Sequence, residues 1–271
     1  MTRLAAALAV LLAGCASGAP TPPAERASPT IVSLNPCTDA ILARVTEPGQ
    51  LLAISHYSKD PRSTSMPAAE AARYPATGGT VEEVLALDPD VVVASTFIAP
   101  ATKAAMDDLG LRVVMFGAAS SIAESEAQVQ DLAALAGHPD RGDRLVRSIE
   151  LALAEARSSA ESVEAALWQP GGIVPGKTSL IIDLLRSTGF SSYSANRNMA
   201  QADYLPLEQV VADPPEVLLV AGSEEGQRHP VLDNLPAMRR EMLDTRLLYC
   251  GGPTIIRAAE RLAEIRRAVA P

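Results

Sequence analysis

Large aromatic side chains that follow strand-like apolar runs are the first candidates for binding chemistry in this sequence of 271 residues. Only nine aromatic residues are present, and four of them stand just past or near the end of such a run: Tyr57, Phe97, Trp168 and Tyr249. Tyr204 precedes a similar run. Ligands of open α/β sheets bind beyond the carboxyl ends of the strands, so these rings are expected to meet at one cleft. Large rigid rings suit a bulky, partly apolar ligand. Taken singly, each ring is more often a core residue, so the inference rests on the set.

A second candidate chemistry is phosphate binding by the segment from Gly171 to Thr178. It reads GGIVPGKT, which matches the phosphate-loop pattern G-x-x-x-x-G-K-[ST] between a strand candidate and a helical run. However, no later strand ends in the Asp that helps such enzymes hold magnesium. An export signal, described below, would also place the chain where nucleoside triphosphates are scarce. We therefore expect a glycine-rich turn that lets backbone approach a ligand, and keep a nucleotide-binding enzyme as the alternative.

The histidines and cysteines form no metal-binding or catalytic pattern. The three histidines lack zinc-type spacing, so no resident metal or cofactor is expected. His56 stands beside Tyr57 and is either a ligand contact or a plain loop residue. No nucleophile motif such as G-x-S-x-G occurs, and we expect a protein that is not an enzyme. Cys37 and Cys250 are open to either a disulfide or free thiols, although a bond between two lobes would restrict closure of a cleft.

The elements that would position these residues alternate between strands and helices. Strand-length apolar runs cover residues 31–34, 51–55, 91–95, 112–116, 166–169, 216–221 and 247–250. Helical patterns lie between them, over residues 100–109 and over residues 122–136, the latter after a capping box of Ser121 and Glu124. Near-continuous apolar strands predict parallel sheets covered on both faces, so the fold class is α/β.

A longer helical pattern separates the two halves. Over residues 139–165 no proline or glycine follows Gly142, and an apolar stripe recurs at spacings of four and three: Leu145, Ile149, Leu153, Ala156, Ala160, Val163 and Leu167. At 1.5 Å per residue this helix would be roughly 40 Å long. It predicts one rigid connector between two Rossmann-like lobes.

A repeated phrase supports two similar lobes. Residues 81–94 read VEEVLALDPDVVVA, and residues 207–220 read LEQVVADPPEVLLV, with Glu82 and Glu208 at the same place. In each copy a short helix ends before a proline and a valine-rich strand follows. A common helix–proline–strand connector would explain the apolar residues and prolines but leaves the two glutamates open.

The N-terminal segment predicts export and anchoring. Arg3 precedes an apolar run over residues 4–12, which is shorter than the about 20 residues of a membrane span and fits a signal peptide. The run ends in LAGC, which resembles the bacterial lipoprotein box and implies lipidation of Cys15; an ordinary signal peptide is the alternative. A tether rich in Pro, Ala and Ser follows. The net charge of −9 and the lack of a basic run argue against nucleic acid as a partner.

Several segments resemble the substrate-binding proteins of ABC importers for cobalamin and ferric siderophores. They read IVSLNPCTDAILARV, LLAISHYSKDP, TGGTVEEVLALDPDVVVAS, WQPGGIVPGKTSLIIDLLRSTGF and YLPLEQVVADPPEVLLVAG. The resemblance covers nearly the whole chain after the tether and implies two lobes, a rigid connecting helix and a ligand clamped between the lobes (a class III periplasmic-binding fold). It implies cleft residues at Tyr57, Phe97, Trp168, Tyr204 and Tyr249, with the turn at Gly79 beside them. The expected ligand-binding set also includes two residues adjacent to these rings, His56 and Gln169. The resemblance also implies that Glu82 and Glu208 pair with arginines of the permease.

The resulting hypothesis is a monomeric, lipid-anchored binding protein in the periplasm or on the envelope surface that delivers a metal chelate to an ABC permease. The expected parts are a signal peptide over residues 1–14, a tether over 15–29, lobes over 30–138 and 166–271, and the helix over 139–165. Few arginines stand near the predicted cleft (Arg62, Arg197 and Arg228), which favours a corrinoid over a ferric siderophore or heme. A structural envelope lipoprotein with a filled cleft is the remaining alternative.

Overall fold

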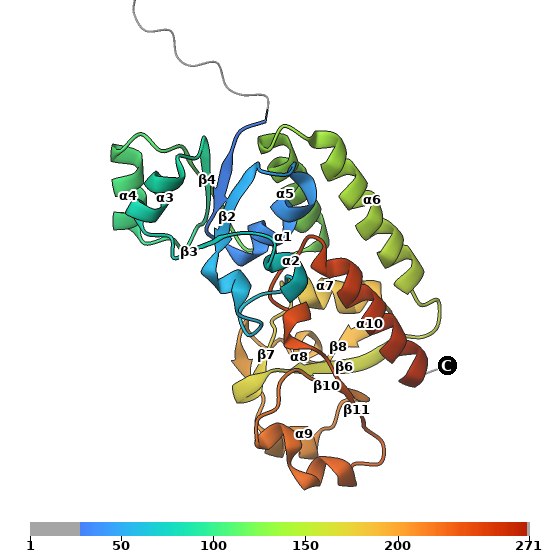
Figure 1. Cartoon of the computed structure of the whole chain (residues 1–271). Coiled ribbons are helices and arrows are strands. Elements are labelled where there is room, and N and C mark those ends of the chain that lie inside the picture. Colours follow the sequence, from blue (N-terminus) through green and yellow to red (C-terminus); the bar gives the residue numbers. More distant parts are fainter. Residues whose placement is uncertain (1–27, 270–271) are drawn as a thin grey trace, which may run out of the picture.

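The computed structural model describes residues 28–269, and the structural statements below concern that part of the chain. The expected signal peptide, Cys15 and most of the tether lie outside it. The chain folds into two α/β lobes with parallel sheets of five and four strands, which confirms the predicted fold class (Figure 1). No helix within the described range is long and apolar enough to cross a bilayer.

The first lobe is built on a parallel sheet in the order β3-β2-β1-β4-β5. Its strands are β1 (Ile31–Ser33), β2 (Leu51–Ser55), β3 (Ala76–Thr77), β4 (Val91–Ser95) and β5 (Val113–Phe116). Its helices are α1 (Pro36–Val45), α2 (Ala68–Ala71), α3 (Val81–Leu87), α4 (Pro100–Asp108) and α5 (Ile122–Leu135). The central strands are buried on both faces, because helices cover the sheet on each side, as the unbroken apolar runs predicted.

The second lobe has a parallel sheet in the order β11-β10-β6-β8 and a small antiparallel ribbon of β7 and β9. Its strands are β6 (Val163–Trp168), β7 (Ile173–Val174), β8 (Phe190–Ser192), β9 (Asp203–Tyr204), β10 (Val217–Val220) and β11 (Arg239–Met242). Its helices are α7 (Leu180–Ser187), α8 (Tyr193–Asn196), α9 (Leu207–Ala212) and α10 (Thr254–Val269).

The prediction of a strand over residues 247–250 is wrong. That stretch follows a 3-10 turn over Thr245–Leu247 and continues as a loop, whereas the fourth strand of the sheet is β11. β11 reads RREM and three of its four residues are exposed, because it lies at the edge of the sheet. An edge strand with charged side chains carries no apolar run by which it could be recognised.

The connecting helix, α6, spans Pro139–Ala156 and is shorter than the predicted range of residues 139–165. Its 18 residues correspond to about 27 Å of helix. Val163 and Leu167 belong to β6 instead. Residues four apart lie on one face of a helix and also on one face of a strand. The apolar pattern therefore continues from α6 into β6 without a change of spacing, which is why the predicted helix was too long. α6 and α10 lie side by side along the edge where the lobes meet (Figure 1).

The repeated phrase forms the same unit in both lobes. Val84 of α3 and Val210 of α9 are fully buried on the inner faces of their helices. Each short helix is followed by a central strand, β4 or β10. The acidic residue after each proline binds the start of the neighbouring strand: Asp90 accepts a hydrogen bond from the amide of Thr30 at 2.8 Å, and Glu216 accepts one from the amide of Glu164 at 2.8 Å. The repeat therefore has a structural role in each lobe.

Candidate functional site

Two adjoining cavities lie at the carboxyl ends of the strands. The first, here called the central cavity, measures about 470 Å³ and is lined by residues of both lobes. The second, the side cavity, measures about 540 Å³ and is lined by residues of the first lobe. Asn35, Ser95 and Phe97 line both, so the two cavities form one continuous cleft. An open cleft contradicts the alternative of a structural protein whose cleft is filled.

Four of the predicted site residues gather at the side cavity. His56 and Tyr57 follow β2, Gly79 follows β3, and Phe97 follows β4. Phe97 is 84% exposed and Tyr57 is 52% exposed, which is unusual for aromatic side chains and leaves their faces free for a ligand. The rings of His56 and Tyr57 contact one another, with their centroids 4.0 Å apart.

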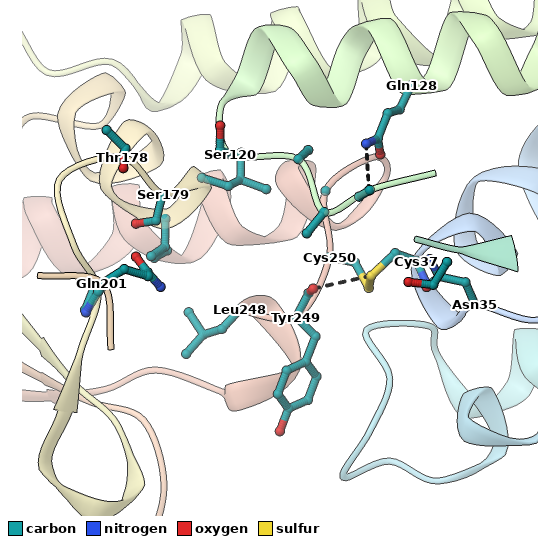
Figure 2. A pocket seen from close by; sticks show the side chains of 18 of the residues that line it. Asn35, Cys37, Ser120, Gln128, Thr178, Ser179, Gln201, Leu248, Tyr249 and Cys250 are labelled. Atoms are coloured by element: carbon teal, nitrogen blue, oxygen red, sulfur yellow. Dashed lines mark hydrogen bonds between the residues drawn. A yellow bond between two sulfur atoms is a disulfide. The ribbon is translucent and has the colours of Figure 1, made fainter. Parts of the chain in front are cut away.

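The central cavity brings in two more of the predicted residues, Gln169 and Tyr249, from the second lobe. The ring of Tyr249 points away from the loop that carries it (Figure 2), and the residue is 44% exposed. Tyr204 lies on the β7–β9 ribbon and is 60% exposed, but it lines neither cavity. It packs over Gly172, where an added Cβ would lie only 2.6 Å from its ring.

Trp168 is placed differently from the prediction. Its side chain is only 3% exposed and lies in the apolar core between β6, β10 and α9, and it lines neither cavity. Its indole Nε1 donates a hydrogen bond of 2.9 Å to the carbonyl oxygen of Leu205. Successive side chains of a strand point to opposite faces, and the residues on either side of Trp168, Leu167 and Gln169, are those that reach the central cavity.

Among residues 28–269, the lining of the cleft includes uncharged polar groups but no Asp, Glu, Lys or Arg side chain. Hydrogen-bonding capacity comes from uncharged amides and hydroxyls, which the sequence analysis missed: Asn35, Ser95, Ser120, Gln128, Thr178, Ser179 and Gln201 (Figure 2). Asn35, Ser95 and Ser120 could have been found by the rule that located the aromatics, because each stands at or after the end of a strand.

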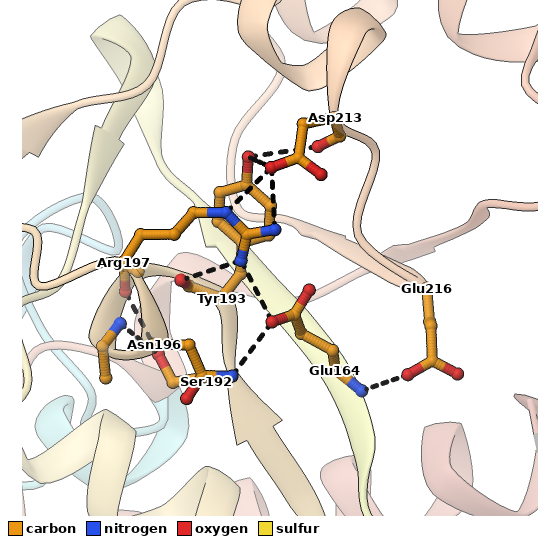
Figure 3. A network of polar contacts seen from close by, with 9 residues as sticks. Glu164, Ser192, Tyr193, Asn196, Arg197, Asp213 and Glu216 are labelled. Carbon is orange, nitrogen blue, oxygen red and sulfur yellow. Dashed lines mark hydrogen bonds and ion pairs between the residues drawn. The ribbon is translucent and has the colours of Figure 1, made fainter.

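The three arginines considered near the cleft line neither cavity. Arg62 pairs with Asp60 at 2.9 Å on the surface, and Arg228 is exposed. Figure 3 shows Arg197 stacked on the ring of Tyr193, 3.4 Å from its centroid, while it pairs with Glu164 and Asp213 at 3.0 and 2.8 Å. This network fastens the end of α9 to the sheet, away from the cleft.

Cys37 and Cys250 form a disulfide, which resolves the alternatives left open by the sequence. Their Cα atoms are 5.1 Å apart although the residues are separated by 213 positions. Cys37 belongs to α1 of the first lobe and Cys250 to the loop before α10, and both line the central cavity (Figure 2). From the sequence, a bond between the lobes is expected to restrict closure of the cleft, and that restriction therefore applies to this protein.

The phosphate-loop pattern is not arranged to hold phosphates. Its middle residues, Ile173 and Val174, form β7, and Lys177 is exposed. The amide of Gly171 donates to Glu224, and the amide of Gly176 donates to Gln201, at 2.6 and 3.0 Å. The backbone donors that a phosphate would need are thus used within the fold.

One buried carboxyl group, that of Asp39, stabilises the turn that lines the side cavity. Asp39 of α1 is fully buried and accepts hydrogen bonds from the Ser55 amide at 2.9 Å and the Ser58 hydroxyl at 2.6 Å. Burial raises the pKa of Asp39 to about 8, although hydrogen bonds from serines lower it in part. These bonds hold α1 against the turn that carries His56 and Tyr57. No group of three or more His, Cys, Asp or Glu side chains within residues 28–269 is placed to hold a metal ion.

Glu82 and Glu208 are both exposed and occupy the second position of α3 and α9. α3 and α9 lie toward opposite ends of the molecule, one on each lobe (Figure 1). Neighbouring Glu83 has a different role: its carboxylate accepts hydrogen bonds from Thr77 and the Gly78 amide, which lowers its pKa and shapes the wall of the side cavity.

Solved structures similar to this one include periplasmic binding proteins. The heme-binding protein HutB of Vibrio cholerae has a TM-score of 0.71 at 15% identity, covering 89% of this chain and 99% of its own. The vitamin B12-binding protein BtuF of Vibrio cholerae has a TM-score of 0.68 at 16% identity, with coverage of 89% and 97%. The heme-binding protein RhuT of Roseiflexus sp. RS-1 has a TM-score of 0.68 at 22% identity, with coverage of 89% and 98%. At these identities the likeness shows the fold.

The comparison with curated proteins finds no match. The family model described as "Periplasmic binding protein" matches residues 31–243, which is well over half of the chain and includes both lobes. The protein therefore belongs to the periplasmic binding protein family, the ligand-binding proteins of ABC importers, as the resemblance in its sequence predicted.

Proposed function

We propose that this protein is the lipid-anchored substrate-binding protein of an ABC importer and that its ligand is a corrinoid of the cobalamin type. The observation that carries the proposal is the cleft itself, which combines exposed aromatic rings with amides and hydroxyls and has no charged side chain. Both parts of that combination match the chemistry of a corrinoid.

A corrinoid is a bulky macrocycle whose rim carries neutral amide groups. Asn35, Gln128, Gln169 and Gln201 can donate to and accept from such amides. Tyr57, Phe97 and Tyr249 offer exposed ring faces to the apolar surface of the macrocycle. The metal of the chelate would arrive within the ligand, so no protein metal site is needed.

Heme and ferric siderophores are the next candidates, and their charge counts against them. Heme carries carboxylates, and many ferric siderophores are anionic. A buried anion needs a cationic partner, and arginine is the usual one. No arginine or lysine within residues 28–269 lines either cavity, and Arg62 and Arg197 pair with carboxylates outside the cleft. The similar structures include binders of both heme and vitamin B12, so the chemistry of the lining is what supports a choice between these ligands.

The remaining parts of the proposal concern delivery. Glu82 and Glu208 are proposed as the contacts to arginines of the permease, one from each lobe, because both are exposed and equivalent in the repeat. Lipidation of Cys15 after export would keep the protein near that permease.

Retention of coloured ligands tests the proposal. The purified protein is mixed separately with cyanocobalamin, hemin or ferric siderophores, then desalted, and its visible spectrum is recorded. We expect about one equivalent of cyanocobalamin to remain, to be lost in Phe97→Ala, and to be kept in Leu151→Ala, which changes an apolar residue exposed on α6. Retention of hemin or a siderophore instead would refute the corrinoid assignment. Retention of a nucleotide that Lys177→Ala abolishes would revive the enzyme alternative.

A further inference from the structure

The disulfide between Cys37 and Cys250 is a covalent link between the two lobes inside the ligand cleft. Cys37 is the second residue of α1, and Cys250 stands in the loop before α10. These are the only cysteines within residues 28–269. Both cysteines line the central cavity, and Figure 2 shows their disulfide where α1 meets the loop before α10. The Cys37 sulfur lies 3.3 Å from the carbonyl oxygen of Tyr249.

The lobes also meet through noncovalent contacts close to this bond. The amide of Gly252 donates to the hydroxyl of Ser125 at 2.7 Å, and the amide of Ile122 donates to the carboxylate of Asp183 at 2.9 Å. Arg257 of α10 donates to the carbonyl of Ser65 in the first lobe. The lobes therefore remain joined when the disulfide is cut, through these contacts and through the chain at α6, but they lose the one covalent cross-link at the cleft within residues 28–269.

We infer that this disulfide is a redox-modification site whose reduction by a thiol or dithiol oxidoreductase weakens ligand binding. Cys37 is half-buried and lines the open central cavity, so its sulfur is the one a thiolate can reach, whereas Cys250 is 5% exposed. Attack on the Cys37 sulfur forms a mixed disulfide and releases Cys250 as a thiolate. The second thiol of the reductant then attacks the mixed disulfide and releases Cys37. Two electrons pass from the reductant, which becomes a disulfide, and the protein thiolates take up two protons.

Cleavage of the link changes the cost of closing the cleft. With the bond intact, Tyr249 and Gln169 of one lobe are held near Asn35 and Phe97 of the other before a ligand arrives. Without it the free protein samples wider openings, and binding must remove that added freedom. The inference deepens the proposed function, since it concerns retention of a ligand in that same cleft.

Thermodynamic linkage makes the effect reciprocal. If the oxidised protein binds the ligand more tightly, the bound ligand must stabilise the disulfide by the same factor. A ligand in the central cavity would also cover the approach to Cys37 and slow its reduction. The empty protein would thus be the reducible form.

The test compares the oxidised protein with Cys37→Ser/Cys250→Ser and with the dithiothreitol-reduced protein. Using cyanocobalamin as the probe, we expect the dissociation constant to rise about fivefold or more in both, which is the lower end of common coupling strengths. Saturating cyanocobalamin should then lower the midpoint potential of the disulfide by about 20 mV for a fivefold change. The double variant should not respond to dithiothreitol. Equal affinities and an unchanged potential would overturn the inference.

Hydrogen exchange of the protein without ligand separates this inference from the proposed function. Removal of the disulfide should speed exchange in residues 247–253 and 117–125, on the two sides of the junction. If oxidised protein does not bind cyanocobalamin, the ligand assignment is wrong, and the exchange result alone decides on the link. Identical exchange in oxidised protein and double variant would refute it.

Discussion

The indole Nε1 of Trp168 and the carbonyl oxygen of Leu205 are joined by a hydrogen bond of 2.9 Å beneath the β7–β9 ribbon. Leu205 in turn donates its amide to the carbonyl of Gly172, which stands opposite it at the same end of the antiparallel ribbon. Trp168 thus fastens the ribbon to the central strand β6 from the inside. The single tryptophan of the chain is a core residue of the second lobe, whereas the exposed rings of Tyr57, Phe97 and Tyr249 line the cleft.

Substitution of Trp168 should therefore reduce stability rather than remove a ligand contact. Trp168→Phe leaves the Leu205 carbonyl without its partner and should lower the free energy of unfolding by about 1–3 kcal/mol. Trp168→Ala adds a cavity and should cost about 3–5 kcal/mol. Urea unfolding measures both, and calorimetry well below the transition should find the ligand affinity of Trp168→Phe unchanged. A direct ligand contact would give the reverse pattern.

The exposed rings should behave in the opposite way. Tyr57→Ala, Phe97→Ala and Tyr249→Ala each remove stacking area worth about 1–2 kcal/mol, which corresponds to a rise in Kd of roughly five- to thirtyfold. Their free energies of unfolding should stay within about 0.5 kcal/mol of the native value, because these side chains are exposed. Leu151→Ala, on the outer face of α6, is the matched control and should change neither quantity. Unaltered affinity in all three would exclude them from the site.

Charge reversal at Glu82 and Glu208 should separate binding from delivery. The variant Glu82→Lys/Glu208→Lys should keep its ligand affinity, because neither residue lines the cleft, and should lose ligand uptake by cells that carry the importer. A lysine near a helix N-terminus costs about 0.3–1 kcal/mol, so the melting temperature must be followed. Glu155→Lys, an exposed change on α6, is the control for net charge. Weakened ligand binding in the double variant would show that the docking assignment is misplaced.

Asp39 should make stability depend on pH. Its pKa rises from 3.8 to about 8 in the folded protein because of burial. Between these values the folded state holds a proton that the unfolded state has released, so this group's contribution to the free energy of unfolding falls as pH rises and is lost once pH passes about 8. Asp39→Asn keeps acceptors for Ser55 and Ser58 but lacks the proton equilibrium.

The measurement is urea unfolding of both proteins from about pH 5 to about pH 9. The free energy of unfolding of Asp39→Asn, minus that of the native protein, should increase with pH up to about 8 and then level off. Other groups titrate alike in the two proteins and cancel in the difference. A difference that stays flat over this range would show that Asp39 is ionised in the fold.

Local sequence determined the two lobes and the central strands of their sheets. The unbroken apolar runs of β2, β4 and β10 are needed because parallel strands are buried on both faces, and such runs are readable without any partner. The repeat around Glu82 and Glu208 is likewise complete in itself, since each short helix, its proline and the following strand are neighbours along the chain. The positions of Tyr57 and Phe97 followed from the same logic, as they come directly after their strands.

Tertiary structure decided what depends on the choice of face or on distance. The alternation of β6 allowed Trp168 either side of the sheet, and only packing against α9 and Leu205 placed it inside. Cys37 pairs with Cys250, 213 residues away, only because loops from both lobes meet at the cleft. The same meeting of loops determines that the cleft lining carries no Asp, Glu, Lys or Arg side chain among the described residues. A sequence encodes the period of each segment, but the distances between remote segments exist only once the lobes have packed.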